Sequence, residues 1–430
     1  MLTRSDSATA AALAAPASEF LQGRTIVLLA LLGMSTSVSA LLLYSFGAMV
    51  VPLQQGLGWS RADIQVAAAC ISAGGAISVN FVGWLNLRHG MRAVSTVSLV
   101  ALSLGLLALS RMEGSIGWLY LGYFVLPFIG IGTTPVTWTE IINRHFVRRR
   151  GLALSIALCG TGVAAATLPP LVTWAVQHWS WRAAYVAMAA APLVLTLPLA
   201  WRWLPSKAAA LQRAASQSVA APALQGLTFA QGIRHPKFWL CNFALSLMVS
   251  AIVGMVTNTV PLLRQIGLDA AQASQVFSAF GIALIAGRLV IGGLVDRFWA
   301  PGVAAVALAL PAAGCLLFLQ ADAATPLWLL VLATALVGVG SGAEFDLAAY
   351  LVARYFGLRD YGKLFGIHLG LVTVGSALAP FAFAALLRQG QGYSLLLMVC
   401  ATCSLLGPLL LLGLGPYPDL DAADAAPPTP

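Results

Sequence analysis

The six residues "GWLNLR", from Gly83 to Arg88, occur a second time in related form as "GGLVDR", from Gly292 to Arg297. The two copies are 209 positions apart, and four further pairs of similar segments follow that spacing to within one residue. Five matches in the same order indicate that the chain consists of two repeats of similar length. The further pairs are "PLQQGLG" at 52–58 with "PLLRQIG" at 261–267, "RHF" at 144–146 with "RYF" at 354–356, Gly160 with Gly370, and Pro170 with Pro380.

Both repeats are strongly apolar. Hydrophobic residues make up 60% of the chain and charged residues 9%, and the mean hydropathy is +0.88, far outside the range of soluble domains. A helix needs about 20 mostly apolar residues to cross a bilayer. The sequence therefore predicts an all-α integral membrane protein with twelve transmembrane helices. The predicted spans are 25–53, 62–87, 93–110, 117–142, 152–176, 183–204, 237–263, 273–296, 303–320, 327–352, 363–387 and 392–415.

The repeats divide these spans into two six-helix bundles. We expect an N-terminal bundle at 25–204 and a C-terminal bundle at 237–415, joined by a polar, Ala/Ser-rich linker at 205–236. The tails are 1–24, which is Ala-rich and predicted to be uncleaved, and 416–430. Two parallel six-span repeats around a site at the bilayer midplane form the architecture used for alternating access.

The distribution of basic residues predicts the orientation, because Lys and Arg are retained on the cytoplasmic side during insertion. With the N-terminus inside, 17 of the 23 lie in cytoplasmic segments, five lie outside, and Arg288 alone lies within a span. Both termini are therefore predicted to be cytoplasmic, in the cell inner membrane. This bias explains most of the net charge of +9, so no nucleic-acid partner is expected.

No motif indicates an enzyme, a cofactor or a metal site. The sequence contains no Walker loop, no H-E-x-x-H set and no G-x-S-x-G. Cys400 and Cys403 have C-x-x-C spacing, but no second pair or nearby histidine completes a metal set, so packing is the favoured interpretation. We expect a monomer embedded in the lipid bilayer.

The loop "GWLNLRHGMR" at 83–92, with its second copy at 292–297, resembles the signature of the major facilitator superfamily. Three segments are similar, more narrowly, to bacterial relatives of the monocarboxylate transporters, and the resemblance covers nearly all of 25–415. They are "SFGAMVVPLQQGLGWSRADI" at 45–64, "NRHFVRRRGLALSIALCGTG" at 143–162 and "GAEFDLAAYLVARYFGLRDYGKLFG" at 342–366. One departure is Leu87, which replaces the usual acid of the first loop, whereas Asp296 keeps that position in the second.

These loops are predicted to hold the cytoplasmic gate. Their glycines allow close helix approach, and their arginines follow helix C-termini, where the macrodipole favours positive charge. The alternative is that the arginines only determine topology. The predicted gating residues are Gly83, Arg88, Gly90, Arg92, Gly292, Asp296 and Arg297.

Arg288 is the most unusual residue in the chain. It lies three residues, or about 4.5 Å, from the midpoint of the eighth span. An arginine there costs about 2.5–3.5 kcal/mol or more, so it should face a water-filled cavity or a partner. One interpretation is a permanent salt bridge with Glu344 or Asp346. The other is an anion site, because a guanidinium matches a carboxylate. In the transporters that the chain resembles, an arginine in the eighth span takes the substrate carboxylate.

Three residues are candidates for proton coupling: Glu344, Asp346 and His368. The two acids are about 200° apart on a helix and cannot share one face. A buried acid is a plausible proton carrier, because burial disfavours its charged form. The alternative is that one or both pair with a basic residue and stabilise the fold. The imidazole of His368 titrates near neutral pH, but a lone histidine near a helix end is more often a packing residue.

Asn258, Tyr44 and Trp138 are polar-tipped side chains at depths where a substrate cavity would be lined, and together with Arg288 they form the predicted substrate site. The resulting hypothesis is a secondary active transporter of a small organic anion, a monocarboxylate, with proton symport. The alternative is an efflux transporter of drugs or other small organic molecules. The fifth span, "GTGVAAATLPPL", lacks the G-P motif usual in such exporters, and a cation carrier would need an acid at the midplane.

Overall fold

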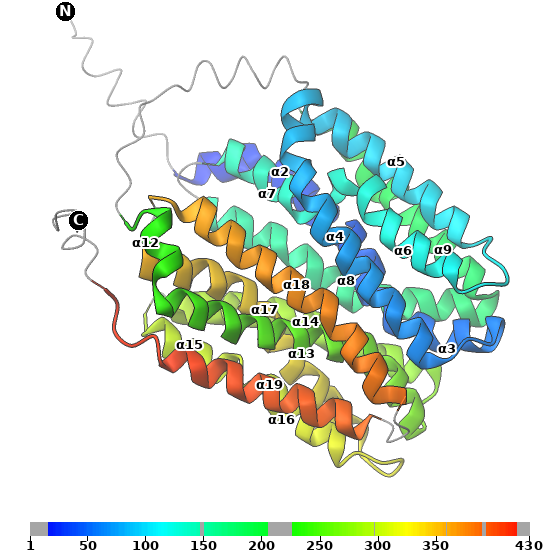
Figure 1. Ribbon diagram of the computed structural model, residues 1–430. Helices are drawn as coiled ribbons and strands as arrows, with labels where there is room; N and C mark the ends of the chain where they lie inside the picture. Colours follow the sequence, from blue (N-terminus) through cyan, green and yellow to red (C-terminus); the bar gives the residue numbers. More distant parts are fainter. Residues whose placement is uncertain are drawn as a thin grey trace, which may run out of the picture.

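The computed structural model describes residues 16–146, 150–204, 226–295, 297–357, 359–388 and 393–418, and the elements assigned there are helices (Figure 1). The first repeat contains α2 (Pro16–Ser35), α3 (Val38–Leu57), α4 (Arg61–His89), α5 (Met91–Leu109), α6 (Gly117–Ile129), η1 (Ile131–Thr133), α7 (Pro135–His145), α8 (Arg150–His178), α9 (Trp181–Ala191), η2 (Pro192–Thr196) and α10 (Leu197–Trp203). The second contains α12 (Phe229–Arg234), α13 (Pro236–Ile266), α14 (Ala270–Val295), α15 (Ala300–Ala307), α16 (Leu310–Leu319), α17 (Leu327–Phe356), α18 (Tyr361–Arg388) and α19 (Ser394–Leu412).

Eleven helices in the described ranges are long and apolar enough to cross a membrane. The predicted fourth span, 117–142, differs, because α6 ends at Ile129 and the chain passes through η1 before α7 begins. Pro135 starts α7, where its missing N–H costs nothing. The first span is also divided, between α2 and α3. The two breaks contact each other, since the N–H of Val38 donates to Thr133 Oγ1 over 3.0 Å.

The two repeats pack against each other along α8 with α14 and along α4 with α18. Small residues form the first seam, because a side chain at Gly281 would meet the backbone of Gly162 and Ala165. Ser278 Oγ on α14 donates to the carbonyl of Ala166 over 2.7 Å. Close backbone approach at small residues is the usual means of helix association in lipid, where no hydrophobic force drives the helices together.

The predicted outer ends of the repeats are closed on each other. Figure 1 shows the start of α4 and the end of α18 meeting at the end of the bundle opposite α12. There the Arg388 guanidinium pairs with Asp63 over 2.7 Å, and Arg61 Nη1 donates to Gln265 Oε1 over 3.1 Å. Deeper in the same seam, the buried Gln65 amide donates to Thr257 Oγ1 over 3.0 Å.

Helix α3 completes this outer closure. At Gly47 its backbone lies against α13, where a Cβ atom would come within 3.3 Å of the Thr257 carbonyl oxygen. In contrast, a Cβ atom built at Gly83, Gly366 or Gly370, in the inner halves of α4 and α18, would meet no atom within 4 Å. In the described residues one end of the bundle is closed, and these glycines toward the other end face open space. With the predicted orientation, this is an inward-facing arrangement.

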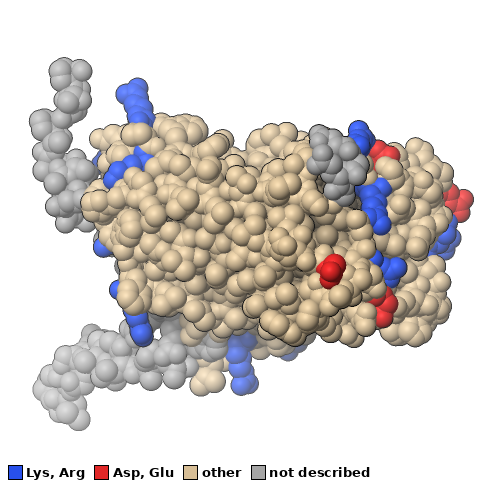
Figure 2. All heavy atoms as spheres, turned by 90° about the horizontal axis from the view of Figure 1, so that it is seen from below, with Lys and Arg blue, Asp and Glu red and all other residues tan. Residues whose placement is uncertain are grey.

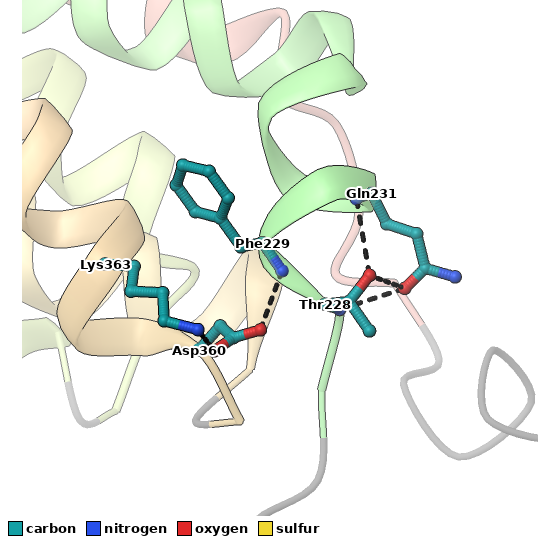
Figure 3. A network of polar contacts seen from close by, with 5 residues as sticks. All are labelled: Thr228, Phe229, Gln231, Asp360 and Lys363. Atoms are coloured by element: carbon teal, nitrogen blue, oxygen red, sulfur yellow. Dashed lines mark hydrogen bonds and ion pairs between the residues drawn. The ribbon is translucent and has the colours of Figure 1, made fainter.

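Helix α12 fastens the start of the second repeat to the loop between α17 and α18 (Figure 3). Thr228 and Gln231 form a capping box at its start. The N–H of Phe229 donates to Asp360 Oδ2 over 2.8 Å, and Lys363 pairs with Asp360 over 2.8 Å. The hydrogen bond from Lys363, together with that from Phe229, holds the pKa of Asp360 below its usual range. These contacts brace the inner ends of α13, α17 and α18 as one unit.

Charged residues lie mainly at the two ends of the bundle on the face in Figure 2, and acidic side chains gather toward one end. The surface between the ends carries few charges and many exposed large apolar side chains, which matches a lipid-facing belt.

The predicted orientation can be tested at two exposed positions, Ser115 before α6 and Ala230 in α12. In a variant without the six native cysteines, Ser115→Cys should react with an impermeant maleimide in intact cells. Ala230→Cys should react only after permeabilisation, because the basic segments keep that side cytoplasmic. Reaction of Ala230→Cys in intact cells would reverse the orientation.

Weakening the outer closure should raise the outward-open population. An exposed ion pair contributes about 0.2–1 kcal/mol, so Asp63→Asn should shift the equilibrium up to about fivefold. The measurement is the maleimide reactivity, from outside, of a cysteine at Val256, which is buried against Gly47. Arg388→Gln should shift the equilibrium by the same amount. The double variant, Asp63→Asn with Arg388→Gln, should shift it no further, because both changes break the same ion pair. Glu113→Gln breaks the outer pair with Arg182 inside one repeat and serves as the control. Equal reactivity in all variants would contradict a closing role for the Asp63–Arg388 pair.

Candidate substrate and coupling site

Arg288 lies in α14 with only 6% of its side chain exposed. Its Nε lies 3.0 Å from Asp346 Oδ2 of α17. Asp346 keeps 31% of its side chain exposed, so the pair is accessible from the acid's side. The distance satisfies an ion pair although the angle at Nε is poor for a hydrogen bond, and Nη1 is buried with no hydrogen-bond partner among the described residues. The guanidinium is therefore neutralised on one edge and unsatisfied on another.

Glycines place this ion pair. A Cβ atom at Gly342 would meet the carbonyl of Leu284 and the backbone nitrogen of Arg288, and one at Gly287 would meet the backbone of Val339. Helices α14 and α17 therefore pack backbone to backbone, and Asp346, one turn beyond Gly342, reaches the arginine. Gly338 and Gly340 of α17 serve the same close packing, because a Cβ atom there would meet Phe280 of α14 and Pro311 of α16, respectively.

The two acids of α17 occupy different surroundings, as their angular separation predicts. Asp346 pairs with Arg288, whereas Glu344 has one carboxylate oxygen, Oε2, that is buried with no hydrogen-bond partner in the described ranges. Both acids lie close enough to Arg288 for its charge to act on them. The salt-bridge interpretation of Arg288 therefore applies to Asp346 and not to Glu344.

Tyr44 is the predicted substrate-site residue that the structure brings to this region. Its ring lies 6.1 Å from that of Phe280 on α14, centroid to centroid, and its hydroxyl lies within reach of the charges of Arg288 and Glu344. Tyr44 is one turn from Gly47 on α3, so the residue that closes the outer end and the residue near Arg288 lie on the same helix face.

Trp138 and Asn258 lie elsewhere. Trp138 is fully buried within the first repeat, donates its indole N–H to the Thr133 carbonyl over 2.9 Å, and packs against Gly33. The Asn258 amide donates to the Gly254 carbonyl and to Thr257 Oγ1, in the outer seam. Their contacts are those of packing residues, and periodicity alone did not reveal which way they point.

His368 is buried between α18 and α13. Its Nδ1 lies 2.8 Å from Asn242 Oδ1, and its ring stacks on Phe365 at 5.7 Å. Because the amide nitrogen of Asn242 donates to the Phe238 carbonyl, its Oδ1 faces the histidine and accepts a hydrogen bond from the Nδ1–H of His368. These contacts match the alternative interpretation of His368 as a packing residue.

The predicted gating residues differ in their surroundings. The guanidinium groups of Arg88 and Arg92 lie over the rings of Trp84 and Trp201, at 5.1 and 4.7 Å, and Arg297 is exposed. Gly90 has φ of 86° at the turn between α4 and α5, a conformation that favours glycine. Asp296 lies outside the described residues.

The expected close helix approach at Gly83 and Gly292 is wrong for this conformation. Neither glycine has an atom within 4 Å of a Cβ position, because the inner end is open. Sequence reasoning also missed the closure at the outer end. Arg61 and Arg388 are two of the five basic residues predicted to lie outside, and their positions near the ends of α4 and α18 were a usable signal for this closure.

Comparison with known proteins agrees with this fold. The model of the Major Facilitator Superfamily matches residues 25–324 and 239–429. The D-xylose-proton symporter has a similar structure, with a TM-score of 0.70 at 15% identity, over 91% of this chain and 98% of that one. That likeness concerns the fold alone.

Curated relatives are distant in sequence. The chain is 27% identical to the gallate transporter of Pseudomonas putida, over 79% of this chain and 86% of that protein. It is 24% identical to the gentisate transporter of Corynebacterium glutamicum, over 85% and 82%. It is 28% identical to monocarboxylate transporter 13 of Bos taurus over 67% of this chain, but spans only 65% of that protein's length. The family match covers well over half of the chain, which therefore belongs to the major facilitator superfamily and is a multi-pass membrane transporter, not an enzyme.

Proposed function

We propose that this transporter carries a small organic anion, a monocarboxylate, together with a proton across the cell inner membrane. The observation that carries the proposal is the state of Arg288, a buried guanidinium with Nε at Asp346 and Nη1 without an acceptor among the described residues. A buried donor left unsatisfied costs about 1–3 kcal/mol. A carboxylate that accepted from it would recover that cost.

The guanidinium geometry allows the substrate and Asp346 to bind at the same time. Arginine presents five N–H donors in a planar fork. Asp346 approaches Nε, and the buried Nη1 lies at the far end of the fork. A substrate carboxylate can therefore bind at the terminal nitrogens without first displacing Asp346. Tyr44, beside Arg288, offers a hydroxyl that can contact the bound anion.

Charge balance supports proton symport. Arg288 and Asp346 form a neutral pair, and the arrival of a carboxylate would leave one uncompensated negative charge near the bilayer centre. Burying such a charge is expensive. Uptake of one proton by Asp346, or by Glu344 with its buried Oε2 atom, restores neutrality. His368 is a weaker carrier, because its ring contacts Asn242 and Phe365, and no contact among the described residues links it to this pair.

The relatives support the substrate class. Two of these relatives are named for gallate and gentisate, which are aromatic monocarboxylates. The third relative is named as a monocarboxylate transporter. All three names describe molecules with a carboxylate that an arginine could bind. We infer a small monocarboxylate for this chain, transported with both termini cytoplasmic by a monomer whose two six-helix halves rock about Arg288.

Substitution of Arg288 tests the anion site. Arg288→Lys keeps the charge but loses the planar fork, and Arg288→Ala loses both. Loss of a charge-assisted hydrogen bond costs about 1.5–3 kcal/mol, so Arg288→Ala should bind carboxylates about ten- to hundredfold more weakly. The measurement is binding of gallate, gentisate and lactate to purified protein by isothermal titration calorimetry.

Asp346 complicates that variant, because removing Arg288 leaves this partly buried acid without its partner. The double variant Arg288→Ala with Asp346→Asn restores neutrality and should recover expression but not binding. Recovery of carboxylate binding in the double variant would show that the arginine only stabilises the fold. Accumulation of neutral or cationic drugs by the wild type, with no carboxylate binding, would favour the efflux alternative.

Neutralising the acids tests the coupling. If Asp346 carries the proton, Asp346→Asn should abolish pH-gradient-driven accumulation in proteoliposomes while keeping counterflow exchange, which moves no net proton. Glu344→Gln is the parallel test of the second acid, and His368→Gln is the control. If both acid variants still concentrate substrate when a gradient is imposed, these residues are not the proton carriers.

A further inference from the structure

A groove of about 590 Å³ lies on the first repeat between α5 and α6, at their outer ends. Gly105 of α5 and Gly122 of α6 lie in its lining, and the surrounding side chains are those of Leu109, Leu126 and Ile129. The two glycines let α5 and α6 pack closely beneath the groove, because a Cβ atom at Gly105 would meet the side chains of Leu126 and Ile129, and one at Gly122 would meet that of Leu109. The groove is independent of the Arg288 site.

The groove faces the bilayer. Large apolar residues beside and within it are exposed, with Leu104 at 61%, Leu121 at 53% and Trp118 at 60%. Helix α5 is one of the spans, so its exposed outer surface lies against lipid. The content of an apolar hollow in such a surface is hydrocarbon, because neither water nor a polar ligand would be favoured there.

The outer mouth of the groove carries a free cation. Arg111, two residues after the end of α5, lines the groove and is exposed, and its guanidinium has no ion pair or hydrogen bond within the part of the chain that the structure describes. Its neighbour Glu113 differs, since it pairs with Arg182 over 3.4 Å. Trp118 lies at the same level, as expected of an aromatic residue at the membrane interface.

We propose that this groove binds one glycerophospholipid of the outer leaflet, with an acyl chain in the hollow and the phosphate on Arg111. An arginine beside an apolar groove matches a molecule that has an anionic head joined to a hydrocarbon chain. Arginine binds phosphate through two parallel N–H donors. The lipid would fill the space between α5 and α6 and stabilise the outer part of the first repeat.

Native mass spectrometry of the purified, delipidated protein titrated with dioleoylphosphatidylglycerol tests the proposal. Arg111→Ala removes the phosphate contact and leaves the hollow. Ala108→Trp fills the hollow from an exposed position and leaves the arginine. Each variant should lose the tightest-bound lipid, with an affinity about tenfold lower than that of the wild type. Arg264→Ala, at the outer end of α13 and away from the groove, is the matched control and should bind as the wild type does.

Phosphatidylethanolamine, titrated in parallel, should show the same losses in the two variants, because its phosphate is the group that Arg111 recognises. Thermal unfolding in detergent without lipid should be unchanged, which separates lipid binding from folding. Lipid adducts of equal affinity in the wild type and both groove variants would overturn the proposal. Loss in Ala108→Trp alone would also overturn it, since the phosphate would then have no role.

Discussion

The structure depends on stabilising the positive charge of Arg288 inside the membrane, where a charge is unfavourable. Arg288 is nearly fully buried in a membrane-spanning helix, and the cost of a charge near the bilayer centre is several kcal/mol unless a counter-charge lies close. Asp346 supplies that charge at 3.0 Å. The pair can exist only where α14 and α17 come within backbone contact, and the glycines at 287, 338 and 342 make that approach possible. Packing and electrostatics are thus a single constraint here, because a larger residue at Gly342 would separate the charges.

The same pair is well suited to carrying an anion. A buried ion pair with every hydrogen bond satisfied would be a structural device, and a bound substrate would have nothing to add. In this protein the pair is incomplete, since Nη1 has no acceptor in the described ranges and Glu344 has a buried carboxylate oxygen without a donor. These two unsatisfied polar atoms can both gain hydrogen bonds if a carboxylate and a proton bind together. That is the physical basis on which we connect substrate and proton.

Much of the fold could be predicted from the sequence, because the signals for it are strong and local. Span length, the repeat at 209 positions and the position of basic residues depend only on composition and order along the chain. The division of the fourth span was missed, although "GIGTTP" at 130–135 holds two glycines and a proline, which are local signals for a helix break. The contact with Val38 of another helix, which stabilises that break, could not be predicted from the sequence. For the site, Arg288 was identifiable from its depth alone. The orientations of Trp138 and Asn258 were not, because they depend on contacts with Gly33 and Thr257 that no periodicity encodes.

The outer closure and the midplane pair differ in strength, and that difference suits alternating access. Asp63 and Arg388 are exposed by 43% and 61%, so water and salt screen them and their separation costs little. Arg288 and Asp346 are shielded and separate only when another ion replaces one of them. Tyr44 lies close to both features. It is one turn from Gly47, which packs in the closed outer seam, and it is within reach of the charge of Arg288. Helix α3 thus has one residue in the outer seam and one beside Arg288, which is the arrangement needed for the charge at Arg288 to influence a closure that is itself weak.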